Sequence, residues 1–205
     1  MTVYPLQGRA PYYTNCYLVI GEAENAQGSR AAVLIDASVT PQQVRQVLHQ
    51  YHAKLSAILL THGHADHIEQ LQPLKEAFSV PVWLDARDAQ TYDLAADCLY
   101  TEAPVTAGDL SLQPIAAPGH TPGSTCLVCG GVLFSGDTLF AGSVGRTDLR
   151  GGDGGALCAS IARLCAALRE DLQVLPGHGA ASTLAEEKRS NPFVRYAMAN
   201  PHGRF

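Results

Sequence analysis

The sequence lacks the features that would place a chain in a membrane or direct it out of the cell. Its 205 residues contain no apolar run approaching about 18 residues, the length that a transmembrane helix needs. Its first residues, MTVYPLQGRAPYY, lack the charged segment and the apolar stretch of a secretory signal. These absences predict a cytoplasmic protein without a membrane partner.

An excess of positive charge is also missing. The chain has 14 Lys and Arg against 19 Asp and Glu, a net charge of −5, whereas proteins that follow nucleic-acid phosphates are rich in positive charge. We therefore expect no nucleic-acid partner. Apolar residues make up 46%, too much for a disordered chain, and no low-complexity linker divides the sequence. A single domain over residues 1–205 is the expected organisation.

The six cysteines do not form a disulfide or zinc pattern. Without a secretory signal, reduced thiols are expected. Cys126 and Cys129 form a C-x-x-C in an apolar segment, but residues three apart on a strand point to opposite faces and cannot chelate one ion. Cys158 and Cys165 lie seven apart on a predicted helix and share one face. Both pairs are predicted to pack in the core.

Strand and helix patterns alternate along the chain. Thr40 and Pro41 are typical of a helix start, and strands precede helices in both halves. This order predicts an α/β sandwich with two mixed sheets inside and helices outside. The predicted strands are 15–20, 32–35, 55–60, 80–84, 110–115, 125–129, 132–134 and 172–175. The predicted helices are 41–52, 68–77, 87–97, 155–168 and 184–189, with a long loop over 135–155 and a tail from Asn191.

Histidines are the unusual feature of this sequence, because five of the eight come directly after predicted strands. A single loop histidine is usually just solvated, but four strand ends that each carry His or Asp beside a small residue predict a metal centre. Imidazole and carboxylate groups are ligands for zinc, iron or manganese, and seven of them suit two ions. The candidates are His62, His64, Asp66 and His67 in THGHADH, His120 in PGHTPGS, Asp137 in SGDTLF and His178 in PGHG.

These four motifs resemble those of the metallo-β-lactamase superfamily, and the resemblance extends from Asn15 to about Phe193. The segments AGSVGRTD and EKRSNPF resemble the glyoxalase II-like hydroxyacylglutathione hydrolases of the short bacterial type. The resemblance implies a four-layer αββα sandwich with two mixed β-sheets and the metals at one edge. It assigns His62, His64 and His120 to one ion, Asp66, His67 and His178 to a second, and Asp137 to a bridge between them.

The resemblance also implies an activity. Two divalent ions, zinc foremost with iron or manganese as alternatives, would activate a bridging hydroxide that attacks a small-molecule thioester such as S-lactoylglutathione. Asp66 would orient this hydroxide as the catalytic residue. No G-x-S-x-G motif offers a serine nucleophile. Only 27 residues follow His178, so the helical domain that helps full-length glyoxalase II enzymes to bind glutathione is not expected.

Residues outside the ligand set are assigned less directly. Arg146 stands where a basic residue of the family binds a substrate carboxylate, and an arginine fork suits that task. Alternatively, Arg146 pairs with Asp148 or Asp153 and braces the loop. Tyr12 and Tyr13 are candidates for the entrance to the site. The sequence makes no prediction of the oligomeric state.

Two other functions are compatible with these motifs. A persulfide dioxygenase on the same fold also carries a G-R-T-D segment, which Gly145–Asp148 matches, and holds a single iron through two histidines and an aspartate. The PGHG motif favours the binuclear hydrolase over this oxidoreductase. A non-catalytic metal-binding module is the second alternative, but ligands on loops with an incomplete protein shell leave positions for water and favour an enzyme.

Overall fold

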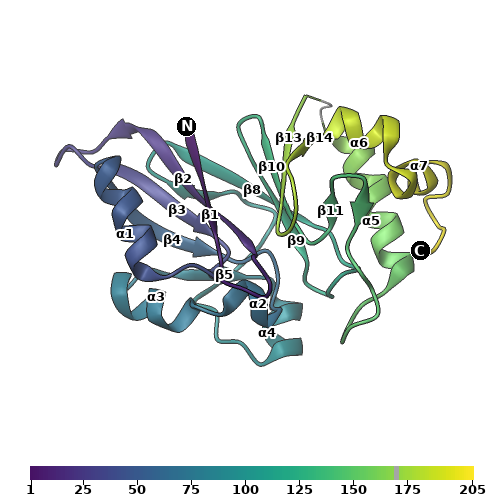
Figure 1. Ribbon diagram of the computed structural model, residues 1–205, viewed down its shortest axis with the longest axis horizontal. Coiled ribbons are helices and arrows are strands. Elements are labelled where there is room, and N and C mark those ends of the chain that lie inside the picture. The colour runs from purple at the N-terminus through teal and green to yellow at the C-terminus, as the bar shows by residue number, and fades with distance from the viewer. Residues whose placement is uncertain (169–170) are drawn as a thin grey trace.

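The computed structural model describes residues 1–168 and 171–205, and Figure 1 shows their arrangement. The first sheet has six strands in the order β1-β2-β3-β4-β5-β6. Pairing is antiparallel from β1 to β3 and parallel from β3 to β6, so this sheet is mixed. Its strands are β1 (Thr2–Gln7), β2 (Asn15–Glu24), β3 (Arg30–Ile35), β4 (Ala53–Leu59), β5 (Val82–Leu84) and β6 (Cys98–Leu99).

The second sheet is also six-stranded and mixed, in the order β14-β13-β10-β9-β8-β7. Only the β10–β13 pair is parallel among its described strands. Its strands are β7 (Val105–Ala107), β8 (Leu110–Ala116), β9 (Thr125–Cys129), β10 (Val132–Gly136), β13 (Gln173–Pro176) and β14 (Ser182–Thr183). A separate hairpin pairs β11 (Leu139–Phe140) with β12 (Ser143–Val144).

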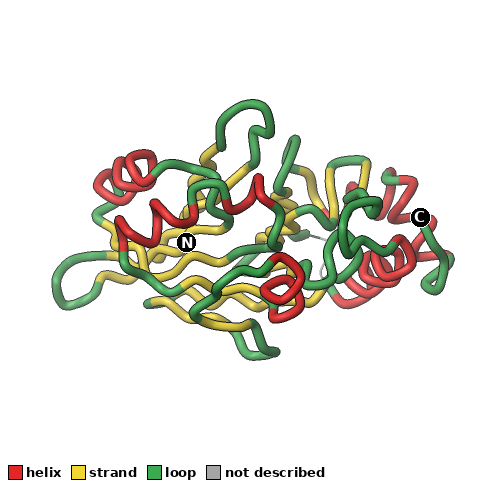
Figure 2. Tube along the Cα trace, turned by 90° about the horizontal axis from the view of Figure 1, so that it is seen from below, coloured by secondary structure: helices red, strands yellow, loops and turns green. Residues whose placement is uncertain are grey.

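Helices cover the outer faces of both sheets. On the first sheet lie α1 (Pro41–Gln50), α2 (Ala65–Ile68), α3 (Leu71–Phe78) and α4 (Ala86–Tyr92). On the second lie α5 (Gly154–Ala167), α6 (Leu184–Ser190) and α7 (Pro192–Ala199). Figure 2, seen from below, shows helices grouped around the C-terminus at one end of the molecule and further helices lying along the strands of the remainder. In the described parts of the chain, no helix has the length and apolar character needed to cross a bilayer.

Three apolar cores separate the four layers. One core lies between the first sheet and its helices, the second between the two sheets, and the third between the second sheet and α5 and α7. This arrangement confirms the expected αββα sandwich with two mixed sheets. Cys126 packs in the core between the second sheet and the helices α5 and α7, and Cys129 packs in the core between the sheets. The two side chains therefore lie on opposite faces of β9, as predicted. Cys158 and Cys165 both pack in the core between the second sheet and the helices α5 and α7. All six cysteines are free thiols.

Two predicted helices differ from the observed ones. The helix predicted over 68–77 is two helices, α2 and α3, because backbone groups of α2 bond to the loop after β3. The amide of Ala37 donates to the carbonyl of His67, and the amide of Gln70 donates to the carbonyl of Ala37. The helix predicted over 87–97 ends at Tyr92, where Asp93 takes a left-handed conformation (φ 55°).

The predictions for the loop and tail were wrong. The segment predicted as a loop over 135–155 contains the β11–β12 hairpin. The predicted tail from Asn191 forms α7, whose first amides at Phe193 and Val194 are capped by the Asn191 side chain. Strand β1 was not predicted. The short strands β6, β7 and β14 were not predicted either, because two or three residues carry almost no periodic signal.

Candidate metal centre

The predicted ligand residues converge at one end of the sandwich. They come from both sheets, because each follows a strand whose end lies at this edge. A cavity of about 420 Å³ opens beside them. His62 and His64 follow β4, Asp66 and His67 lie on α2, His120 follows β8, Asp137 follows β10 and His178 follows β13.

The seven side chains fall into three overlapping groups whose potential ligand atoms lie within 4.8 Å of one another. The first group matches the set expected for the first ion, and the third matches the set expected for the second. The middle group links the two. The groups are His62, His64 and His120, then His62, His67 and Asp137, and finally Asp66, His67 and His178.

Asp137 lies between the two sets of histidines. Its Oδ1 is 3.3 Å from His67 Nε2, and its Oδ2 is 3.5 Å from His120 Nε2 and 3.6 Å from His178 Nε2. Its two oxygens therefore face members of both predicted sets. This is the placement that a bridging carboxylate requires.

The residues present fit a metal ion. Three buried polar atoms, His67 Nε2, His120 Nε2 and Asp137 Oδ1, have no hydrogen-bond partner. Such atoms are costly in a folded protein unless something compensates for their lost hydration. Gly177 lies against the same group, where a side chain would collide with Asp137 and His67. Imidazole nitrogens and carboxylate oxygens together suit zinc, iron or manganese.

The electrostatics of the cluster also suit metal ligands. Burial, reinforced by the neighbouring imidazoles, lowers the pKa of His62 well below its usual value and that of His64 to about 4. These rings are therefore neutral, as ligands must be. Burial would also lower the pKa of His67, but Asp36 and Asp137 outweigh it and raise that pKa.

Asp36 binds the ring nitrogen of His67 that points away from the cluster, and it was not among the predicted site residues. Its Oδ2 accepts a hydrogen bond from His67 Nδ1 at 2.8 Å, and its Oδ1 accepts from the amide of Thr61 at 2.8 Å. The bond fixes the tautomer and aims Nε2 of His67 at the cluster. The signal was present in the sequence, because Asp36 follows β3 directly, just as Asp137 follows β10.

Asp66 is held from two sides. The hydroxyl of Thr14 donates to Asp66 Oδ2 at 3.2 Å, and His178 Nε2 lies 3.0 Å from the same oxygen. Ser38 donates to the backbone carbonyl of Asp66. Thr14 and Ser38 were not predicted, because isolated hydroxyl residues carry no distinctive sequence pattern.

Arg146 makes the ion pair that the sequence left as an alternative. Its guanidinium donates two hydrogen bonds of 2.7 Å to Asp148, and both side chains are exposed. Asp153 instead caps α5. The backbone carbonyl of Arg146 accepts from His120 Nδ1 at 2.7 Å, so the main chain of this loop orients a predicted ligand. Arg146 and Tyr12 line the cavity, whereas Tyr13 is not among its lining residues.

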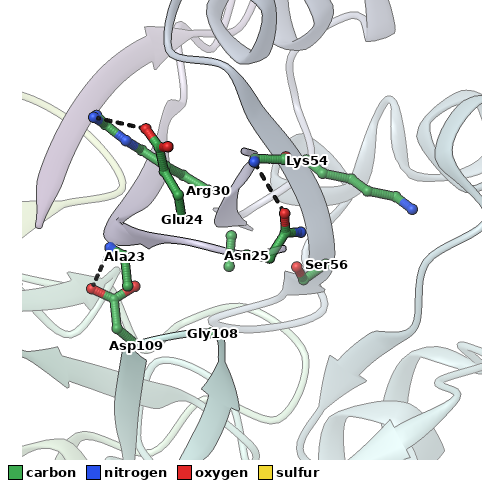
Figure 3. A pocket seen from close by; sticks show the side chains of 10 residues that line it. Ala23, Glu24, Asn25, Arg30, Lys54, Ser56, Gly108 and Asp109 are labelled. Atoms are coloured by element: carbon green, nitrogen blue, oxygen red, sulfur yellow. Dashed lines mark hydrogen bonds and ion pairs between the residues drawn. The ribbon is translucent and has the colours of Figure 1, made fainter. Parts of the chain in front are cut away.

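A second cavity, of about 340 Å³, lies at the turn between β2 and β3 and contains none of the predicted ligands (Figure 3). Two of its charged side chains have partners. Arg30 lies 3.7 Å from Glu24, and Asp109 accepts from the amides of Glu22 and Ala23. Five of the seven predicted ligands, His64, Asp66, His120, Asp137 and His178, line the cavity beside the histidines instead.

Comparison with known sequences agrees with the motifs. The sequence pattern of the metallo-β-lactamase superfamily matches residues 9–178. A curated relative, the hydroxyacylglutathione hydrolase GloC of Haemophilus influenzae, is 31% identical over 204 residues, covering 89% of this chain and 93% of the relative. The family match therefore includes all seven predicted ligands.

Three solved structures resemble the whole sandwich. The BLEG-1 B3 metallo-β-lactamase has a TM-score of 0.82 at 33% identity, covering 94% of this chain and 99% of its own. ETHE1 from Myxococcus xanthus has a TM-score of 0.79 at 29% identity, with coverage of 97% and 90%. TTHA1623 in a di-iron-bound form has a TM-score of 0.76 at 37% identity, with coverage of 93% and 100%.

Proposed function

The chain belongs to the metallo-β-lactamase superfamily, and from this we propose that it is a binuclear metal-dependent hydrolase that cleaves a small-molecule thioester, with S-lactoylglutathione as the first candidate. The observation that carries the proposal is the convergence of seven potential ligand side chains beside an open cavity. The similarity to a hydroxyacylglutathione hydrolase supports the thioester as the substrate class.

We assign the metal ligands as the resemblance implied. Two divalent ions bound there would polarise the thioester carbonyl and lower the pKa of a water molecule to about 7. Zinc is the first candidate, and the di-iron form of one similar structure keeps iron open. One ion would be held by His62, His64 and His120, the second by Asp66, His67 and His178, and Asp137 would bridge the two.

The protein's own groups would orient the reactants. Asp66 lines the cavity and is held in place by Thr14, so its carboxylate can accept a hydrogen bond from an attacking water and fix its direction. Phe140, Val144 and Leu149 give the same cavity an apolar wall. Such a wall suits an acyl group and excludes bulk water from one side of it.

Arg146 is assigned to the carboxylate of an anionic substrate. Because its partner Asp148 is exposed, a substrate carboxylate at the cavity mouth can compete for the guanidinium. The variant Arg146→Ala should therefore lose more kcat/KM on a thioester that carries a carboxylate than on an uncharged one. Equal losses on the two substrates would contradict carboxylate binding.

A persulfide dioxygenase is the second candidate function, because ETHE1 from Myxococcus xanthus shares the fold and 29% of the aligned residues. The two activities differ in their metal content and in their co-substrate. The hydrolase needs only water, whereas the dioxygenase consumes molecular oxygen.

One experiment separates them. The metal content of the purified protein is measured, and thiol release from S-lactoylglutathione and oxygen uptake with glutathione persulfide are followed on the same sample. We expect two ions per chain and thiol release. Asp137→Ala should lower kcat/KM about 100-fold or more, while His49→Ala, an exposed histidine on α1, should leave it unchanged. One iron per chain with oxygen uptake would contradict the hydrolase.

A further inference from the structure

Helix α4 contains two polar side chains that the mechanism above does not use. Asp88 and Tyr92 lie four residues apart, so they project from the same side of the helix. Both reach the loops that carry the histidines of the first group. Neither belongs to the motifs that identify the family.

Asp88 binds both loops at once. Its side chain is fully buried, and its Oδ2 accepts from the amide of Gly63 at 2.8 Å and from the hydroxyl of Thr121 at 2.8 Å. Its Oδ1 accepts from the amide of Gly123 at 2.6 Å. Gly63 separates His62 from His64, and Thr121 directly follows His120. One carboxylate therefore sets the spacing between the two loops that supply all three histidines.

Tyr92 determines which nitrogen of His64 faces the cluster. The Tyr92 hydroxyl donates to the carbonyl of Arg150 at 2.8 Å, so its oxygen is left to accept the Nε2–H of His64 at 3.1 Å. A proton on Nε2 leaves Nδ1 as the free, ligating nitrogen. That atom lies 3.1 Å from Nε2 of His62, which is itself a potential ligand atom. Tyr92 thereby points the Nδ1 lone pair into the first group.

The second group is supported by different residues. His67 is fixed by Asp36, and Asp66 by Thr14, and these residues lie outside α4. Within residues 1–168 and 171–205, no hydrogen bond joins Asp88 or Tyr92 to Asp66, His67 or His178. Asp36 also reaches the first group, because the Thr61 hydroxyl that donates to it lies 3.1 Å from His62 Nδ1, but Asp88 and Tyr92 contact the first group alone.

We propose that Asp88 and Tyr92 are positioning residues that set the metal affinity of the group His62, His64 and His120 independently of the second group. This inference rests on the ligand assignment in the proposed function, but not on the substrate. Residues that orient metal ligands through hydrogen bonds typically contribute about 10–100-fold to metal affinity.

Zinc titration in competition with a chromophoric chelator tests the proposal on Asp88→Asn and Tyr92→Phe. Each variant should bind one ion about 10–100-fold more weakly and leave the other affinity within about twofold. In a His178→Ala background, which disables the second group, the remaining ion should show the same weakening. Asp93→Asn is the matched control, because this exposed aspartate ends the same helix, and it should leave both affinities unchanged.

Equal weakening of both ions, or none, would overturn the proposal. If Asp88→Asn fails to fold by circular dichroism, Tyr92→Phe decides the outcome, since it removes one hydroxyl and keeps the ring that packs on Gly63. Wild-type protein that binds no zinc would overturn the ligand assignment as well. Wild-type protein that shows the selective effect but no thiol release would overturn only the thioester substrate.

Discussion

The backbone and the side chain of Arg146 have separate tasks. Its carbonyl orients His120, while its guanidinium pairs with Asp148 at the mouth of the cavity. The hydrogen bond from Arg146 lowers the pKa of Asp148 to about 2. A side-chain substitution at Arg146 therefore tests the ion pair and leaves the carbonyl that holds His120 in place.

Arg146→Gln should raise the pKa of Asp148 from about 2 towards the usual value of about 4. In the wild type, the stabilisation that this ion pair gives is complete at pH values above the usual pKa of an aspartate. It is lost as the pH falls towards the lowered pKa of about 2. Carboxyl-carbon NMR titration of Asp148 measures the shift. An unchanged pKa in the variant would show that Arg146 is not its cause.

At the scale of single elements, the junction between α6 and α7 secures one wall of the cavity. Asn191 is fully buried, and its side-chain oxygen caps α7. Its amide nitrogen donates to the carbonyls of Phe140 and Ser143 at 3.3 and 2.9 Å and to Glu187 Oε2 at 2.7 Å. The β11–β12 hairpin, which carries Phe140 into the cavity wall, is therefore tied to the two C-terminal helices.

Asn191→Ala should destabilise the protein by about 2–4 kcal/mol, because it removes a helix cap and leaves buried acceptors without their donor. Urea denaturation followed by circular dichroism measures the change in the free energy of unfolding. Asn200→Ala, at the exposed end of the same helix, is the control and should cost less than about 1 kcal/mol. Similar losses in the two variants would contradict the role of the junction.

At the scale of the whole molecule, the ligand groups join the two sheets. His62 and His64 follow β4 of the first sheet, while His120, Asp137 and His178 follow strands of the second. Bound ions would bridge elements that otherwise meet through the apolar core between the sheets. Metal binding is therefore expected to stabilise the entire sandwich.

Removing the metal with EDTA should lower Tm, and adding zinc should restore it. Free metal at 100 times its dissociation constant stabilises the folded state by about 2.7 kcal/mol. Differential scanning calorimetry with and without EDTA measures the effect. Asp137→Ala, which lacks the proposed bridging carboxylate, should show a smaller change of Tm on addition of EDTA. A wild-type Tm that does not change when EDTA is added would contradict the assignment of the metal ligands.

The sequence predicted the helices and strands to a different extent than the residues of the candidate site. Long periodic segments such as α1 and α5 were predicted to within two residues of their ends, because periodicity is a local property. The predicted tail was wrong, since Asn191 was not recognised as a cap. The seven ligand candidates could be named from their motifs, whereas Asp36, Asp88 and Tyr92 could not be placed around them.

The sequence by itself determined the residue types at the strand ends and the order of strands and helices, because both are written in short, local patterns. Only the tertiary structure decided which residues hold the ligands, since those contacts join distant parts of the chain. Asp66 and His178 are 112 positions apart, and Asp88 reaches Gly123 across 35 positions. Hydrogen bonds of this kind depend on how the two sheets pack, and no local spacing encodes that packing.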